Sequence, residues 1–321
     1  MRVLPLAATM LLLNGWLIEP AHADEAAQWL NRLSQAQRQQ SFQGTFVYER
    51  NGSFSTHEIW HRVHDGTVHE RMLQLDGSAQ EVVRVGGRTQ CVSGAFISGL
   101  GAVPEASAEA LDPQKLKKWY DLAVIGKSRV AGRAAVIVAL TPKDQHRYGF
   151  ELHLDRETGL PLKSLLLNDK GQLLERFQFT GLDTDDIPTD AQMQASRECK
   201  SVALSTDQVA AANVEQAWRS DWLPAGFELA NSSARIDPET KTTVSSLMYD
   251  DGLARFSVFL EPVNGAEVMD TRVQLGPTVA VSRRLATPEG EVRVTVVGEV
   301  PMGTAERVAL SMRSNTSLPK P

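Results

Sequence analysis

Two histidines and a glutamate stand at the spacing that zinc peptidases use. The run His57-Glu58-Ile59-Trp60-His61 matches the pattern His-Glu-x-x-His. On a helix, residues four apart share one face, so both imidazoles can bind one zinc ion while the glutamate acts as general base. The chemistry would be metal-assisted peptide hydrolysis, and it requires this segment to be helical.

The sequence around the motif favours strands instead. Tight-turn dipeptides cut the stretch from Phe46 to Val92 into short segments, because Asn-Gly and Asp-Gly accept the positive φ of hairpin turns. These dipeptides are Asn51-Gly52, Asp65-Gly66, Asp76-Gly77 and Gly86-Gly87. The segment that carries the motif therefore reads as one strand of a hairpin ladder.

Strand geometry cannot bring the motif together. A rise of about 3.3 Å per residue separates His57 from His61 by roughly 13 Å and turns Glu58 to the opposite face. Both imidazole nitrogens would have to lie about 2.1 Å from one zinc ion, which this span prevents. We therefore predict no metal site, and we expect the four histidines from His57 to His69 to be solvated. Because the sequence also has no Gly-x-Ser-x-Gly elbow and no phosphate loop, we predict no enzyme and no cofactor. A zinc peptidase is the remote alternative.

The N-terminus predicts export. Arg2 is followed by an apolar run from Val3 to Leu13, and Ala21-His22-Ala23 is a small-x-small cleavage site. The run is shorter than the about 20 residues that span a bilayer. We predict a signal peptide over residues 1–23, cleaved before Asp24, and a mature chain in the periplasm. An uncleaved anchor is the alternative.

Charge and cysteine content narrow the function further. The formal net charge is −6, whereas nucleic-acid binding needs a strongly basic face. The chain has two cysteines, Cys91 and Cys199. An oxidising compartment permits a disulfide between them, which would close a loop of about a hundred residues and stabilise the fold by roughly 4–5 kcal/mol. The spacing leaves a disulfide and two buried thiols equally open.

The pattern of elements predicts an α+β protein with two domains. A helix from Asp24 to about Gln40 precedes the hairpin ladder, and an irregular stretch follows from Ser93 to Leu111. Asp112-Pro113 then opens a short helix, since aspartate caps a helix and proline suits its first position. More antiparallel strands end at Phe179, and a helix is expected near Ala191 to Glu198. The predicted domains are residues 24–200 and 218–321, joined by a linker over 201–217.

The second domain shows fewer clear elements. Strands are predicted near Val244–Tyr249, Leu253–Leu260 and Val292–Val297, where apolar and polar residues alternate. A final helix is predicted from about Thr304 to Met312. This region should form a smaller domain that mixes sheet and helix.

Several motifs, in order along nearly the whole mature chain, match one known family. They are Trp119-Tyr120-Asp121, Gly132-Arg133, Arg147-Tyr148, Thr158-Gly159-Leu160-Pro161, Trp222-Leu223-Pro224-Ala225-Gly226-Phe227, Asp251-Gly252-Leu253 and Val297-Gly298-Glu299. With these motifs the chain resembles the MucB/RseB family of periplasmic sigma-factor regulators. No single motif is diagnostic, but their order and spacing together are fairly specific.

The resemblance implies a fold and a function. The first domain would be a half-open antiparallel β-barrel with helices, similar to periplasmic lipoprotein carriers, and the second a smaller mixed β/α domain. The protein would bind the periplasmic domain of a single-span anti-sigma factor, shield it from site-one proteolysis and so restrain an envelope-stress sigma factor, as in alginate regulation. A lipid, a lipopolysaccharide fragment or a lipoprotein would release it. A lipid or lipoprotein carrier is the alternative, and homo-oligomerisation is left open.

A sheet that curls around an apolar interior suits an acyl chain. The predicted pocket residues are apolar or aromatic and come from the strands, the short helix and the irregular stretch. They are Phe46, Trp60, Phe96, Leu100, Trp119, Tyr148, Phe150, Leu152, Phe177 and Phe179. For each of them ordinary core packing is the alternative. Phe96 and Leu100 are the strongest candidates, because the stretch that holds them lacks strand constraints.

Overall fold

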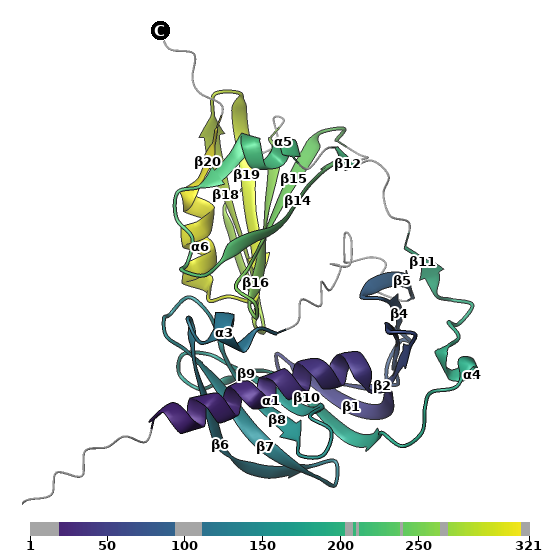
Figure 1. The fold of residues 1–321 in the computed structure, drawn as a ribbon. Helices are drawn as coiled ribbons and strands as arrows, with labels where there is room; N and C mark the ends of the chain where they lie inside the picture. The colour runs from purple at the N-terminus through teal and green to yellow at the C-terminus, as the bar shows by residue number, and fades with distance from the viewer. Residues whose placement is uncertain are drawn as a thin grey trace, which may run out of the picture.

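The chain folds into two sheets with helices packed on them (Figure 1). The structure is a computed structural model, and it describes residues 19–93, 111–202, 208–209, 212–237, 240–263 and 269–315. No helix in these ranges is long and apolar enough to cross a membrane. The predicted signal peptide lies outside them except for its last residues, where helix α1 (Glu19–Gln39) has already begun. The helix thus starts earlier than predicted.

The first domain is a large antiparallel sheet. Its strands are β1 (Phe42–Arg50), β2 (Ser53–His64), β3 (Thr67–Gln74), β4 (Glu81–Val85), β5 (Arg88–Val92), β6 (Tyr120–Val130), β7 (Arg133–Pro142), β8 (Gly149–Asp155), β9 (Pro161–Leu167), β10 (Leu173–Asp183) and β11 (Lys200–Ser201). Their order is β11-β5-β4-β3-β2-β1-β10-β9-β8-β7-β6. The two end strands, β11 and β6, do not pair with each other, so the sheet stays open. This confirms the predicted fold class.

Local turn chemistry explains the ladder. Asn51 and Asp65 adopt positive φ values of 53° and 48°, each followed by a glycine that also has positive φ. These turns join β1 to β2 and β2 to β3, as the sequence predicted. Helix α3 (Pro113–Leu116) is capped by Asp112, whose side chain accepts the amide hydrogen of Gln114. That start of the helix was also predicted correctly.

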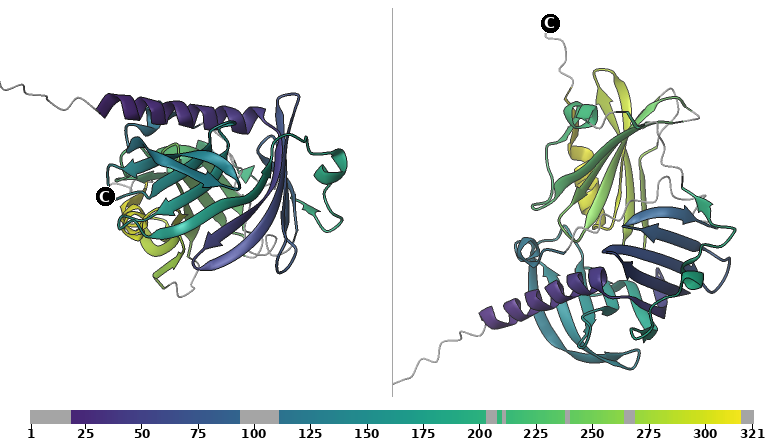
Figure 2. Two further views of the ribbon diagram at one scale, coloured as in Figure 1. Left: turned by 90° about the horizontal axis from the view of Figure 1, so that it is seen from below. Right: turned by 45° about the vertical axis from the view of Figure 1, so that its right-hand side comes forward.

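One face of the large sheet carries α1 (Figure 2). Ala26, Leu30 and Leu33 of the helix pack against buried residues of β6, β7 and β8, among them Leu122 and Val138. We call the face that α1 covers the inner face and the opposite one the outer face. The core of this domain therefore lies between the helix and the strands, and it extends along the inner face toward β1 and β10.

The second domain is smaller and has its own core. Its elements are β12 (Gln208–Val209), α5 (Ala212–Ala217), β13 (Trp218–Ser220), β14 (Glu228–Ile236), β15 (Thr243–Asp250), β16 (Arg255–Pro262), β17 (Thr271–Leu275), β18 (Thr278–Thr287), β19 (Gly290–Gly298), α6 (Met302–Ser311) and β20 (Met312–Ser314). Seven strands form one sheet in the order β12-β14-β15-β16-β19-β18-β17, and β13 pairs with β20. Helix α6 packs on this sheet (Figure 1). The predicted strands correspond to β15, β16 and β19, and the predicted helix to α6.

The predicted linker, residues 201–217, is too long. Its first residue belongs to β11, and its last six form α5, where Val214 is buried in the second core. The two sheets are joined by the chain between Ser201 and Gln208. The helix predicted near Ala191 to Glu198 is also shorter and earlier, since α4 spans Asp190–Met193.

Candidate functional site

The zinc-peptidase motif lies on a strand. In β2, His57 pairs with Phe46 and His61 pairs with Phe42 of β1, whereas Glu58 pairs with Thr45. Paired residues share a face, so Glu58 is turned away from both histidines, as predicted. Among the described residues, no group of three or more His, Cys, Asp or Glu side chains could hold a metal ion.

Both motif histidines are buried, which corrects the expectation of solvated positions. The His57 ring stacks on Phe46 with a centroid distance of 5.0 Å. Its burial lowers the pKa of His57, because a charged imidazole would lose its hydration. The two ring nitrogens of His61 lie 2.9 Å from the Gln37 carbonyl and 3.0 Å from Glu70. These histidines therefore tie β2 to its neighbours and to α1.

Three predicted pocket residues gather on the inner face of β1 and β10. The ring centroids of Phe46 and Phe177 are 4.7 Å apart, and those of Phe177 and Phe179 are 5.0 Å apart. Tyr48 lies beside them and, like Phe177, is only half-buried. We call Phe46, Tyr48, Phe177 and Phe179 the aromatic patch. Because Tyr48 and Phe177 are only half-buried, part of this aromatic surface stays exposed on the inner face.

Two more candidates share this face but are covered differently. Phe150 and Leu152 of β8 pack in the cluster under α1, where Leu152 is buried and Phe150 half-buried. A hollow of about 450 Å³ opens at the ends of β7, β8 and β9, and Phe150 is the one predicted residue that lines it. Phe96 and Leu100 lie outside the described residues. The lipid pocket as a whole stays a prediction.

Trp60 is on the wrong face for that pocket. It pairs with Gln43 of β1 and Arg71 of β3. Trp60 is three residues from His57, an odd number, and His57 is the partner of Phe46. Because side chains alternate along a strand, Trp60 lies on the outer face. There the Arg71 guanidinium stacks 4.7 Å from its ring, and Trp60 is 6% exposed. Trp60 is thus a packing residue of the outer face.

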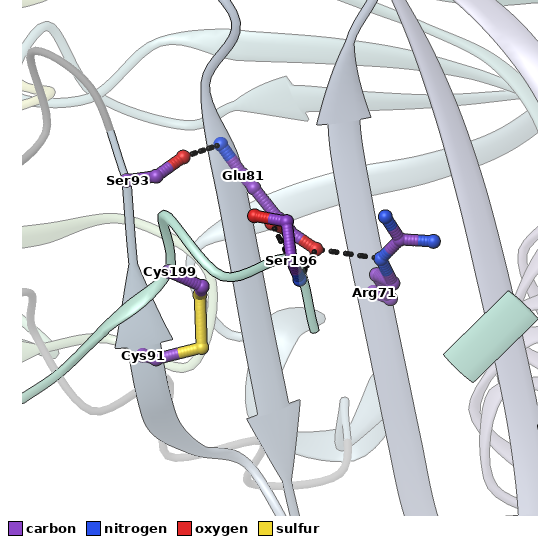
Figure 3. The surroundings of a disulfide bond; sticks show 6 residues. All are labelled: Arg71, Glu81, Cys91, Ser93, Ser196 and Cys199. Carbon is purple, nitrogen blue, oxygen red and sulfur yellow. Dashed lines mark hydrogen bonds and ion pairs between the residues drawn. A yellow bond between two sulfur atoms is a disulfide. The ribbon is translucent and has the colours of Figure 1, made fainter. Parts of the chain in front are cut away.

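A segment after β10 crosses the outer face. We call residues 184–202 the strap. Arg62 of β2 pairs with Asp190 of the strap at 2.6 Å, and Arg71 donates to the Gln192 carbonyl at 2.8 Å. At its end Cys199 forms a disulfide with Cys91 of β5, with Cα atoms 5.4 Å apart (Figure 3). The structure thus contains the bond that the sequence left open, and the bond holds the strap just before the second domain.

A buried carboxylate secures the middle of the strap. Glu81 is 1% exposed and lies 2.6 Å from Arg71 Nε (Figure 3). It also accepts the backbone amide of Ser196 at 3.2 Å. Burial acts to raise the pKa of Glu81, but the hydrogen bonds from Ser196 and Arg71 outweigh it, so the pKa lies below its ordinary value. Glu81 therefore stays ionised and bound to the strap.

Trp119 and Tyr148 lie at the contact between the two domains. Tyr148 donates its hydroxyl to the Val300 carbonyl of the second domain at 3.1 Å, and burial raises its pKa to about 12. Trp119 packs on Gly226, where a Cβ atom would come within 2.2 Å of the indole ring. Gly226 also has a φ of +88°, so a side chain is excluded there on two counts. These two predicted pocket residues are interface residues.

A buried ion pair forms the centre of this interface. Arg147 of the first domain lies 2.6 Å from Asp251 of the second, and both side chains are 0% exposed. Asp251 also accepts hydrogen bonds from Tyr120 and from the amides of Leu253 and Ala254. Burial raises the pKa of Asp251, although the amides and Arg147 act against the rise. We call this group the Arg147 cluster.

A second, more exposed contact lies at the end of β1. Arg50 donates to Thr278 and lies 3.8 Å from Glu299, both in the second domain. It also lies 4.0 Å from Glu175 of β10, whose carboxylate accepts the Tyr48 hydroxyl at 2.5 Å. Burial and this hydrogen bond raise the pKa of Tyr48. We call this group the Arg50 cluster.

Sequence reasoning did not predict either cluster, although it singled out many of their residues. Asp251 accepts an amide of its own turn, and the same carboxylate also pairs with Arg147. The motifs that carried the family resemblance supply Trp119, Arg147 and Gly226, which meet at the interface. The motifs signalled that these residues matter but gave no sign that they touch.

The protein has two domains. The first is an open curved sheet with a helix along its inner face, and a buried ion pair ties it to the smaller sheet of the second. The model of the MucB/RseB N-terminal domain matches residues 25–203, and that of the MucB/RseB C-terminal domain matches residues 212–313. The chain belongs to the MucB/RseB family.

The chain is 61% identical to the sigma factor AlgU regulatory protein MucB of Pseudomonas aeruginosa, covering 97% of this chain and 98% of that one. The solved complex of P. aeruginosa MucA and MucB matches with a TM-score of 0.81 at 62% identity, covering 91% of this chain and all of that one. A crystal structure of MucB matches with a TM-score of 0.69 at 59% identity, covering 91% of this chain and 98% of that one. The TM-score is thus higher with the MucA/MucB complex.

Proposed function

We propose that this protein is a periplasmic negative regulator of an envelope-stress sigma factor, and that it binds the periplasmic domain of a transmembrane anti-sigma factor. The observation that carries the proposal is the near full-length similarity to MucB, together with the higher similarity to MucB in its complex with MucA. The signal peptide predicted over residues 1–23 places the mature chain in the compartment where such a domain is found. N-terminal sequencing of the exported protein should begin at Asp24.

Binding would protect the anti-sigma factor from site-one proteolysis. A protein that covers the cleavage segment lowers the population of the open, cleavable form in proportion to its occupancy. The relatives are named as regulatory proteins, which supports a role in binding rather than catalysis. The sigma factor would then stay sequestered as long as the complex persists.

A lipid or the acyl chain of a lipoprotein would be the releasing signal. The aromatic patch supports this part of the proposal, because Tyr48 and Phe177 remain half-buried on the inner face. Ile59 and Met72 of the neighbouring strands are half-buried beside them. An acyl chain laid on this surface would remove apolar area from water at about 25 cal/mol per Å².

The test uses the mature chain as bait for periplasmic extract and solubilised membrane. Recovery of a single-span anti-sigma factor supports the regulator, whereas recovery of lipoproteins alone would favour a carrier. In a second arm, the periplasmic domain of P. aeruginosa MucA is digested by the site-one protease with and without the chain. We expect slower cleavage with the chain and restored cleavage when lauroyl lysophosphatidylglycerol is added. Equal cleavage in all three samples would contradict the proposal.

A further inference from the structure

The aromatic patch continues directly into the Arg50 cluster. Three successive cross-strand pairs of β1 and β10 share the inner face, namely Phe46 with Phe179, Tyr48 with Phe177, and Arg50 with Glu175. The first two pairs belong to the patch, and the third reaches the second domain. A change in the aromatic patch can therefore reach the domain contact through the adjacent pair of Arg50 and Glu175.

Tyr48 stands at the junction of the two. Its ring packs with the patch, while its hydroxyl lies 2.5 Å from the Glu175 carboxylate. The same carboxylate oxygen is 4.0 Å from Arg50 Nε, too far for a hydrogen bond. Glu175 therefore hydrogen-bonds to Tyr48 and keeps only a long ion pair with Arg50. Arg50 is free to reach across to Thr278 and Glu299.

The Arg50 cluster is incompletely satisfied. Arg50 Nε is buried and has no hydrogen-bond partner, and the contact with Glu299 is a loose one at 3.8 Å. Gly276 makes room for the arginine, since a Cβ atom there would lie 2.8 Å from its Cγ. An arginine with an unused donor beside a carboxylate at 4.0 Å can change partners through a small side-chain rotation.

We infer that Tyr48 couples lipid binding to the domain contact by deciding whether Glu175 or the second domain holds Arg50. An acyl chain on Phe177 needs the space beside it and displaces the Tyr48 ring. Glu175 then loses its phenol donor, and the nearest cation is Arg50. Pairing with Glu175 withdraws Arg50 from Thr278 and Glu299, so the contact with β18 and β19 opens. This inference rests on the proposed function, for which it supplies a mechanism of release.

Two substitutions are expected to shift the contact between the domains in opposite directions. Tyr48→Phe keeps the ring but removes the donor, so Glu175 should take Arg50 and the contact should open without lipid. Glu175→Gln removes the charge that competes for Arg50, so the contact should stay closed even when lipid binds. Arg176→Gln is the matched control, because Arg176 pairs with Glu49 at 3.3 Å between the same two strands but on the other face.

The experiment measures the distance between nitroxide labels by pulsed electron paramagnetic resonance on the full mature chain. The labels are carried by Glu25→Cys in α1 and Glu289→Cys in the β18–β19 turn, both exposed, while the two native cysteines are bonded to each other. The lipid probe is lauroyl lysophosphatidylglycerol below its micelle concentration. In the unsubstituted chain and in Arg176→Gln, we expect the probe to lengthen the distance.

Tyr48→Phe should show the lengthened distance without the probe, and Glu175→Gln should keep the short distance with the probe bound. Affinity for the MucA periplasmic domain should fall about 5- to 10-fold in Tyr48→Phe, within the usual range of allosteric coupling. A short distance in folded Tyr48→Phe would overturn the inference, whether or not MucA binds. If the distances behave as expected but MucA does not bind, the proposed function fails instead.

Discussion

The two contacts between the domains differ in the burial of their charged side chains and in the distance between them. In the Arg147 cluster, Arg147 and Asp251 are fully buried and 2.6 Å apart. In the Arg50 cluster, the side chains of Arg50 and Glu299 are 29% and 48% exposed and lie 3.8 Å apart. An exposed ion pair is worth about 0–1 kcal/mol, whereas breaking a buried pair by removing one partner costs about 3–5 kcal/mol. The Arg147 cluster is therefore expected to stay closed, whereas Arg50 in the Arg50 cluster can exchange partners.

This difference would suit the release by a ligand that we propose. A ligand shifts an equilibrium only by its difference in affinity for the two states, which is typically about 1–3 kcal/mol. Such a difference can open the Arg50 cluster but not the Arg147 cluster. Motion would then pivot at Arg147 while β18 and β19 separate from Arg50.

The largest effect on stability is expected from breaking the buried ion pair of Arg147 and Asp251. Arg147→Met leaves Asp251 buried without its cation and should lower the free energy of unfolding by about 3–5 kcal/mol. Chemical denaturation followed by fluorescence measures the loss. The double variant Arg147→Met with Asp251→Asn should recover most of it, because no uncompensated charge remains and the amide oxygen can still accept the amides of Leu253 and Ala254. A loss below about 1 kcal/mol in the single variant would show that the pair does not hold the domains together.

Removing the disulfide should lower the stability of the fold without changing either of the two contacts between the domains. Cys91→Ser combined with Cys199→Ser should lower the free energy of unfolding by about 2–4 kcal/mol, the typical range for a disulfide, which lies below the roughly 4–5 kcal/mol that the chain-entropy model gives for a sequence separation of 108. Reduction of the unsubstituted chain should give the same loss in denaturation experiments. The distance between labels on the two domains should stay unchanged. A lengthened distance would mean that the strap, and not Arg147, fixes the domains.

Tyr148→Phe tests the interdomain hydrogen bond next to the Arg147 cluster. The substitution removes the donor to the buried Val300 carbonyl and should cost about 1 kcal/mol in thermal or chemical unfolding. The interdomain distance should not change. Tyr48→Phe serves as the contrast, because its effect should fall on the distance. If the two tyrosine variants behave alike, the proposed division between a fixed and an exchangeable contact is wrong.

The smallest effect is expected at Glu299. Partial desolvation at the domain contact, followed by the neighbouring Glu175 carboxylate, raises the pKa of Glu299 above its ordinary value of 4.5, although 48% of its side chain is exposed. The folded state therefore holds this proton more tightly than the unfolded chain does, and the resulting stabilisation is lost as the pH rises through the folded-state pKa. Glu299→Gln should flatten the stability profile above pH 4.5 and change the stability at pH 7 by less than about 0.5 kcal/mol. Urea unfolding across pH measures both, and a steeper profile would contradict the assignment.

Local signals predicted the framework of the first domain well. The hairpin turns at Asn51 and Asp65 depend on residues that tolerate positive φ, and they need no distant partner. The cap at Asp112 is likewise local. The same turns made β2 a strand and removed the zinc motif as a site. Strands β17 and β18 were missed because their alternation is weak, although β17 pairs with β18, and β18 with β19, through short turns.

The sequence by itself determined the turns, the strand that carries His57, and the family, because each depends on residue types at short spacing. Only the tertiary structure decided which face each side chain occupies. Trp60 and Phe46 looked alike in sequence, yet pairing places them on opposite faces, because a shift of one residue in register exchanges the faces of a strand. The tertiary structure also decided that Arg147 meets Asp251, 104 residues away. Contacts at that separation depend on how two finished domains dock, which no local pattern encodes.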